Sequence, residues 1–214
     1  MDEEITIIDS NTRNERIKNF FINNKKKLIL TISLILVIII GYLSFEKSKE
    51  RTKIKLANQY NLALIDLNPD NKQKTIDEMV NVVKSKDTTY SPLALYHLLD
   101  NNLLENNEEI NNLFNELIEK TNLENEIKNL IIYKKALFNS DFVGENELLK
   151  ILNPVINSES IWKSHALYLL AEFFYSKDEK QKAKEFFNQI LVLPDANNDI
   201  KIESQKRLNR DLGE

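Results

Sequence analysis

The sequence predicts an all-α protein with one N-terminal transmembrane helix, followed by an α-solenoid of degenerate helical hairpins. An uncharged apolar run covers residues 28–45. The 214 residues include only 3 Gly and 4 Pro, so long stretches contain no helix-breaking residue. Beyond residue 45 the apolar residues recur every three or four positions, which is the period of one helix face.

The composition excludes several classes of site. There are no cysteines, so disulfides, thiolate catalysis and zinc–thiolate centres are excluded. The net charge is −4, and no basic face interleaved with aromatic residues is present, which argues against nucleic-acid binding. With 29% charged and 42% hydrophobic residues, the chain is neither a disordered protein nor a multi-pass transporter.

The run at 28–45 is long enough to cross a bilayer. At 1.5 Å per residue it measures about 27 Å, close to the hydrocarbon thickness of about 30 Å. Lys25, Lys26 and Lys27 precede it, and Tyr42 and Phe45 stand near its end, where aromatic residues suit the membrane interface. A cleaved signal peptide is disfavoured, because no small-residue cleavage site follows Tyr42.

The lysine triplet favours a cytoplasmic N-terminus, with residues 1–27 as a polar juxtamembrane tail and residues 46–214 as a soluble domain on the other side. Residues 1–14 are expected to be unstructured. Ile17, Phe20 and Phe21 have helical spacing among basic residues, and two interpretations stay open for them: an interfacial amphipathic turn or a solvated linker.

The soluble domain divides into helices at its caps and prolines. The first continues from residue 46 to Leu67 and ends before Pro69. Asp70, Ser91 and Asp178 are predicted to cap later helices, and Pro154 to end one at Leu152. The expected later helices begin near Asp70, Ser91, Asn107, Leu123, Glu145, Ser160, Asp178 and Asp199, and the last one is a polar end cap.

A repeat emerges when the helices are superposed in pairs. Phe114, Leu152 and Phe187 align in the second helices, and Leu98, Ala136 and Ala171 align in the first helices. The spacing is close to the roughly 34 residues of a tetratricopeptide repeat, although Leu98 and Ile110 replace small residues. A plain helical bundle is the alternative fold.

The order of these parts resembles a known family. Its pieces are Asp2-Glu3-Glu4, the pair Arg13 and Arg16, the span 28–45, and the segment 160–171 followed by Ala183. Together they resemble the ancillary SecYEG translocon subunit family (YfgM-like proteins) of Gram-negative bacteria, which carry a tetratricopeptide repeat-like domain.

The resemblance implies a single-pass protein of the bacterial inner membrane, with its repeat domain in the periplasm. It implies a scaffold accessory to the SecYEG translocon that links exported proteins to periplasmic chaperones. The expected partners are therefore translocon subunits, chaperones or exported clients. A second hypothesis is an envelope scaffold that coordinates cell division or cell-wall synthesis.

The residues predict no catalytic, cofactor or metal site, so we expect no enzyme and no small-molecule substrate. His97 and His165 lie on predicted helices without the spacing of zinc ligands, and they are interpreted as structural or surface histidines. A curved helical scaffold of this kind is expected to have a groove that binds protein segments. The only tryptophan, Trp162, is a candidate anchor for a peptide in that groove, and the competing interpretation is a core side chain.

Overall fold

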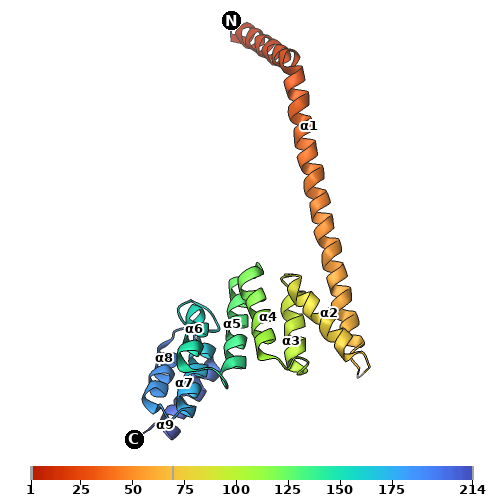
Figure 1. The fold of residues 1–214 in the computed structure, drawn as a ribbon. Coiled ribbons are helices and arrows are strands. Elements are labelled where there is room, and N and C mark those ends of the chain that lie inside the picture. Colours follow the sequence, from red (N-terminus) through yellow and green to blue (C-terminus); the bar gives the residue numbers. More distant parts are fainter. Residues whose placement is uncertain (1, 69, 214) are drawn as a thin grey trace. The chain divides into compact units, whose positions relative to one another are not determined.

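The computed structural model describes residues 2–68 and 70–213, and every regular element within them is a helix (Figure 1). The chain divides into two compact units, one up to Lys55 and one that starts at Leu56. Pro69, which was predicted to end the first helix of the soluble domain, lies outside the described residues.

The first helix, α1, covers Asp2–Ile65 without interruption. The prediction of an unstructured segment at residues 1–14 is therefore wrong for the described residues from Asp2 onward. Acidic residues at positions 2–4 suit the positive end of a helix dipole, which favours a helical start there. The apolar run and the helix predicted from residue 46 onward are thus parts of one helix.

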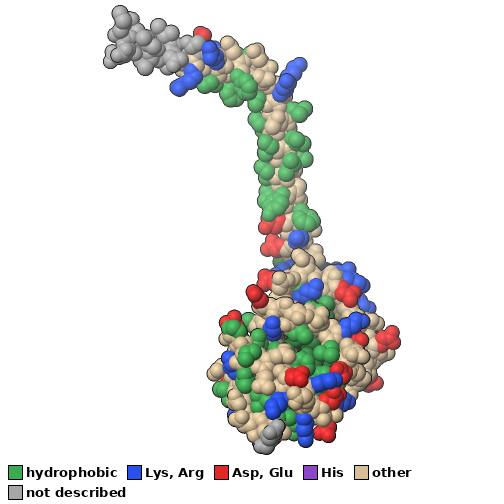
Figure 2. Space-filling model, turned by 90° about the vertical axis from the view of Figure 1, so that its left-hand side faces the viewer, with side chains coloured by type: hydrophobic (Ala, Val, Ile, Leu, Met, Phe, Trp, Pro, Cys, Tyr) green, Lys and Arg blue, Asp and Glu red, His purple; other side chains and the backbone are tan. Residues whose placement is uncertain are grey.

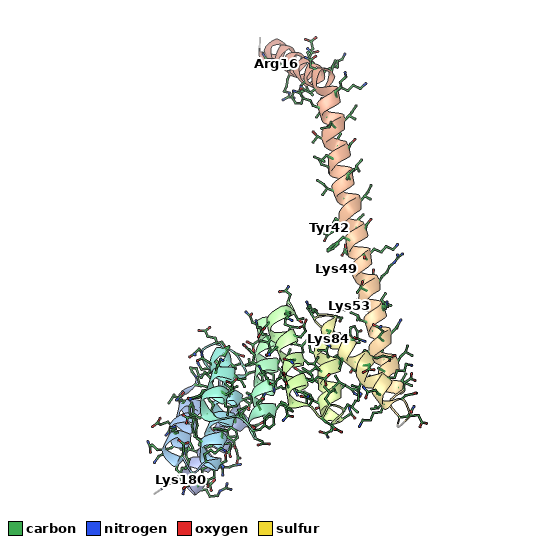
Figure 3. All side chains as sticks on the ribbon, viewed as in Figure 1. Arg16, Tyr42, Lys49, Lys53, Lys84 and Lys180 are labelled. Atoms are coloured by element: carbon green, nitrogen blue, oxygen red, sulfur yellow. The ribbon has the colours of Figure 1, made fainter. Side chains whose placement is uncertain are left out.

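The side chains of the apolar run are not covered by any other part of the described chain. The helix segment Arg13–Ile65 contains an 18-residue window of mean hydropathy 2.7, and none of that window is buried. Figure 3 shows the side chains around Tyr42, Lys49 and Lys53 radiating away from α1. This helix is thus long and apolar enough to cross a membrane near the N-terminus.

The end of α1 belongs to the second unit and packs into its core. Ala63 is fully buried and Leu56 nearly so, while the ring of Tyr60 lies 5.9 Å from that of Tyr90. Leu67 packs against the same cluster. The apolar stripe predicted on this segment is confirmed by these contacts.

The remaining helices follow in chain order (Figure 1). Their bounds are α2 Lys72–Lys84, α3 Tyr90–Asp100, α4 Asn107–Lys120, α5 Asn125–Asn139, α6 Glu145–Ile156, α7 Lys163–Ser176, α8 Lys180–Val192 and α9 Asn198–Asp211.

Four of the predicted caps and stops are wrong, those at Asp70, Asp178, Pro154 and Ser91. Before α2, the side chain of Asn68, not of Asp70, accepts hydrogen bonds from the backbone. Asp178 has a φ of 59° and ends α7 instead of capping α8, since Glu179 N donates to Phe174 O at 2.9 Å. Aspartate tolerates this left-handed conformation better than most residues, and the bond closes the helix end.

Pro154 does not end α6, which continues to Ile156. The missing N–H affects only the last turn of the helix, where Asn157 N donates to Asn153 O at 3.2 Å. Val155 is fully buried just beyond the proline. Burial of this side chain favours one further turn over an early stop.

Ser91 also differs from its predicted role as a helix cap, because it lies inside α3 and is fully buried. Its hydroxyl accepts from Asp87 N at 2.9 Å and donates to Val82 O at 2.8 Å. The hydroxyl therefore joins the end of α2 to the start of α3. The helix start itself is fixed by Asp87, whose carboxylate accepts from the N–H groups of Thr89 and Tyr90.

The helices pack mainly with their neighbours in the chain. α5 with α6, α7 with α8, and α2 with α3 form the closest pairs, while α2 also contacts α4, and α7 also contacts α9. The six side chains aligned in the repeat superposition are all fully buried: Leu98, Phe114, Ala136, Leu152, Ala171 and Phe187.

Two hydrophobic clusters share the second unit. One joins the end of α1 to α2, α3, α4 and Ile131 of α5, and the other joins α5 to α9. A polar seam also joins α4 to α5, where the amides of Asn111 and Asn139 donate to each other at 3.0 and 2.9 Å. Lys135 also donates to Asn115 at 2.7 Å, and burial lowers the pKa of its amine.

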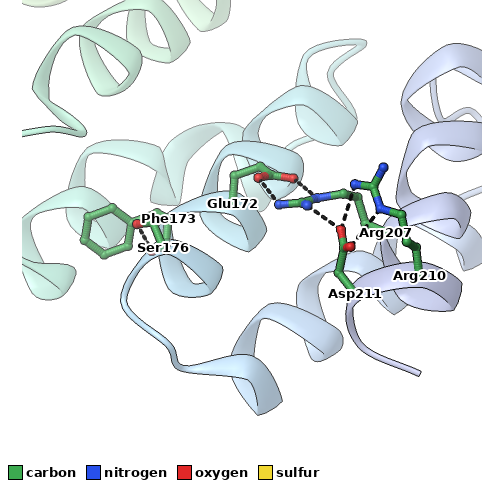
Figure 4. Close-up of polar contacts among 6 residues, drawn as sticks. All are labelled: Glu172, Phe173, Ser176, Arg207, Arg210 and Asp211. Atoms are coloured by element: carbon green, nitrogen blue, oxygen red, sulfur yellow. Dashed lines mark hydrogen bonds and ion pairs between the residues drawn. The ribbon is translucent and has the colours of Figure 1, made fainter. Parts of the chain in front are cut away.

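The last helix is fastened to α7 by Arg207. Its guanidinium donates to both carboxylate oxygens of Glu172 at 2.7 and 2.5 Å, pairs with Asp211, and lies 4.4 Å from the ring centre of Tyr175 (Figure 4). The side chain of Arg207 is only 15% exposed, so this bidentate contact is shielded from water. At the end of α7, Ser176 donates to Phe173 O.

We expect Ser91→Ala to destabilise the protein by about 1–3 kcal/mol, because the substitution leaves the part-buried N–H of Asp87 without its acceptor. Urea unfolding of the full-length protein in detergent, followed by circular dichroism, measures the change. The matched control is Ser140→Ala, since Ser140 donates to Leu137 O at a solvent-accessible helix end. Equal effects of the two substitutions would contradict the bridging role.

The Arg207 cluster predicts a pH dependence. Hydrogen bonds from Arg210 and Arg207 lower the pKa of Asp211 to about 2 from its usual 3.8. The folded state favours the ionised carboxylate of Asp211. The stabilisation that this carboxylate gives to the folded protein is therefore present above about pH 4 and is lost as the pH falls towards 2. We expect the urea midpoint of the native protein to fall more steeply over this interval than that of Asp211→Asn. Parallel curves would refute the contribution.

Candidate functional site

A groove runs along one face of α2. Gln73, Ile76, Asp77, Val80 and Lys84 line it. Their three- and four-residue spacing places them on one stripe of the helix. Ile76 and Val80 are each only 8% exposed and form an apolar floor, whereas the polar members of the stripe are solvent-exposed.

The opposite wall comes from the loop after α3 and the start of α4. Asn102 adopts a φ of 49° and lets Leu103 N donate to Leu98 O at 2.9 Å, which closes α3 and buries Leu103 against the floor. Asn106 then caps α4 by accepting from the N–H groups of Glu108 and Glu109. These two helix ends fix the wall, and the groove between them has a volume of about 900 Å³.

A second hollow of about 410 Å³ continues the first along α4. The two hollows share Lys84, Asn106 and Glu109. Glu116 stands in the second hollow and is paired with Lys120 at 2.6 Å and Lys86 at 3.6 Å. The hydrogen bond from Lys120 lowers the pKa of the Glu116 carboxyl, so this carboxylate is ionised and already compensated.

The remaining charges make the groove acidic. Its carboxylates besides Glu116 are Asp70, Asp77, Glu105, Glu108 and Glu109, and its lysines are Lys72 and Lys84. Five carboxylates against two ammonium groups leave an excess of negative charge. An apolar floor with an acidic rim suits a cationic segment that also carries apolar side chains.

Trp162 lies at the N-cap position of α7 and is half-buried. Its ring stacks on Tyr133 of α5 at 6.0 Å between centroids and lies 5.1 Å from the ring of His165. It also packs against the second hydrophobic cluster. The two neighbours of Trp162, Ile161 and Lys163, line a separate hollow of about 530 Å³ at the loop ends next to α7.

The position of Trp162 is fixed by Glu126 of α5. Its carboxylate accepts from Ser160 Oγ at 2.8 Å and from Ile161 N at 3.3 Å, and Ser160 Oγ in turn accepts from Trp162 N at 3.1 Å. Ser160, predicted as the start of this helix, therefore stands three residues before α7 and ties it to α5.

The two histidines lie far apart in the chain, on α3 and α7. Both are partly buried, and burial lowers the pKa of each imidazole. The ring of His165 packs edge-on against Tyr133 at 5.9 Å, and His97 Nδ1 lies 3.2 Å from the Asn101 amide. Across the described part of the chain, no cluster of three histidine or acidic side chains has the geometry to hold a metal ion.

Comparison with protein-family models, with curated proteins and with solved structures finds no match for this chain. The α2/α4 groove is therefore the main structural indication of function. Sequence reasoning predicted a groove but not its residues. The signal in the sequence was the high number of acidic residues between Asp70 and Glu116. These residues form one surface because α2 packs against α4, and that contact could not be read from the sequence.

The packing of Trp162 predicts a structural cost. We expect Trp162→Ala to lower stability by about 2–3 kcal/mol, less than for a fully buried aromatic residue, because the ring loses its contacts with Tyr133 and His165. Circular dichroism in urea measures the loss. Ile161→Ala is the matched control, since Ile161 is 64% exposed and should change stability little. Unchanged stability in Trp162→Ala, with loss of partner capture, would favour the peptide-anchor interpretation.

Proposed function

We propose that this chain is a membrane-anchored scaffold that binds protein segments in the α2/α4 groove. The observation that carries the proposal is the groove itself, with an apolar floor at Ile76 and Val80 and an acidic rim. Binding needs no further chemistry than burial of apolar side chains and charge pairing. The helical pairs that follow act as tetratricopeptide-like hairpins of a solenoid, which extend this surface.

The anchor is the apolar part of α1, inserted in the bacterial inner membrane with its N-terminus in the cytoplasm. Lys25, Lys26 and Lys27 support this direction, because basic residues are retained on the cytoplasmic side. The groove-bearing unit is then periplasmic. The anchor limits the scaffold to partners near the membrane, which raises their effective concentration at the groove.

The length of the groove sets the size of the bound segment. The 13 residues of α2 measure about 20 Å, which an extended chain covers with about six residues. A segment with two or three lysines or arginines and alternating apolar side chains matches the floor and the rim. Its binding depends on salt, since the rim charges are exposed.

The place of action is beside the SecYEG translocon, where the scaffold passes exported proteins to periplasmic chaperones. The resemblance to the ancillary translocon subunit family supports this part of the proposal. A groove tethered to the periplasmic side of the inner membrane is close to newly exported segments, which also supports this location.

Photo-crosslinking in intact cells tests the proposal. A photoreactive residue at Asn81 probes the groove, one at Ile38 probes the span, and one at the exposed Asn188 of α8 is the control. We expect translocon subunits from position 38, and exported proteins or chaperones from position 81 but not from position 188. Division or cell-wall proteins alone at these positions would replace the translocon proposal by the envelope-scaffold hypothesis.

A charge variant tests the groove within the same experiment. We expect Glu105→Gln combined with Glu109→Gln to reduce crosslinking at position 81 several-fold, because it removes two rim carboxylates. The control combines Glu159→Gln with Glu185→Gln, which removes the same charge at exposed sites outside the groove. Equal yields from both double variants would refute the groove as the binding surface.

A further inference from the structure

The helical segment ahead of the span, residues 13–27, carries large apolar side chains on its surface. Ile17, Phe20, Phe21 and Ile22 are each between 50% and 60% exposed. Phe20 and Phe21 pack only edge-to-face on each other, at 6.0 Å between centroids. Exposure of such side chains to water is unfavourable. Because they lie directly before a membrane span, they can contact lipid instead.

The helix bends ahead of the span (Figure 1). The side-chain amide of Asn24 donates to Phe20 O at 3.0 Å, so this carbonyl is shared between the helix ladder and a side chain. Such back-bonding is a recognised cause of helix bending. Apolar side chains gather on the inner side of the bend (Figure 2).

A shallow hollow of about 390 Å³ lies at this bend. It is lined by Phe21 and Ile22 before Asn24, by Lys25, and by Leu28, Ile29 and Ile32 of the span. Apart from the ammonium group of Lys25, its lining is apolar. An apolar hollow with one cation in its lining complements a phospholipid, which offers an acyl chain and a phosphate.

The opposite arc of the same helix is polar. At 100° per residue, Arg16, Asn19, Asn23 and Lys26 project away from the hollow. Lys18 lies on the same side as the hollow, and Phe20 lies beside Arg16 at the edge of the polar arc, so the division into two faces is partial. This arrangement fits a helix that lies in the interface, whereas a solvated linker gains nothing from it.

We propose that residues 13–27 lie in the membrane interface and that the hollow holds an anionic phospholipid, with its phosphate on Lys25 and an acyl chain along Leu28, Ile29 and Ile32. The lipid is the occupant because the hollow is continuous with the span and so stands at the boundary between headgroups and hydrocarbon. The proposal rests on the anchor of the proposed function but not on its groove.

The absence of cysteine from the sequence makes single spin labels unambiguous. Full-length variants Phe21→Cys and Ile22→Cys probe the hollow, and Asn19→Cys and Asn23→Cys probe the opposite arc. Ile35→Cys reports the span and Asn188→Cys reports water. In phosphatidylcholine vesicles containing phosphatidylglycerol, we expect labels at 21 and 22 to be relaxed by oxygen, as at 35, and labels at 19 and 23 by a water-soluble nickel chelate, as at 188.

The lipid headgroup is tested with Lys25→Gln in the Ile22→Cys background. We expect phosphatidylglycerol to slow the motion of the label at 22, and Lys25→Gln to abolish this response. Lys26→Gln removes the same charge from the polar arc and should leave the response intact.

The outcomes separate the proposal from the anchor. Exposure of positions 21 and 22 to the nickel chelate, with position 35 in lipid, would overturn the interfacial helix and leave the anchor intact. Spin–spin broadening at 22 that disappears on dilution with lipid would assign the hollow to a second copy of the chain. A response to phosphatidylglycerol that survives Lys25→Gln would overturn the phosphate contact.

Discussion

Each short helix after α1 has one apolar face, and burial of that face against a neighbour is the constraint on which the rest of the second unit depends. Single helices of 11 to 15 residues are marginal in water. Fully buried side chains such as Phe114, Phe174 and Phe187 supply the compensating free energy. Alanines at positions 136, 171 and 183 let the helices approach closely enough to bury them.

The same constraint explains why the core is divided. At the α4/α5 contact the buried groups include amides, and Asn111 and Asn139 satisfy each other there. A reciprocal amide pair costs little when complete but contributes less than apolar packing. The amide pair stands beside apolar contacts across the same helix pair, since Ile131 of α5 is buried in the first cluster and the rings of Phe114 and Phe138 lie 6.2 Å apart. The groove lies entirely on the α2/α4 side of the amide pair, and Trp162 on the other.

Helix positions followed well from the sequence, because apolar periodicity reports directly on burial. Helix ends followed less well. Ser91, Asp70 and Asp178 were each assigned as caps from residue type, yet Ser91 bridges two helices and Asp178 occupies a left-handed position. Residue type records which conformations a side chain tolerates, whereas its role depends on which backbone groups the tertiary structure leaves unpaired nearby.

The groove shows the same limit at a larger scale. Ile76 and Val80 fit the apolar face of α2, and Glu108 and Glu109 fit the first turn of α4, where carboxylates suit the helix dipole. Both statements hold for the separate helices. The groove exists only because α2 packs beside α4 across the loop that ends at Asn106, a long-range pairing without a local sequence signature. The groove therefore depends on the relative placement of ordinary residues, not on any single motif.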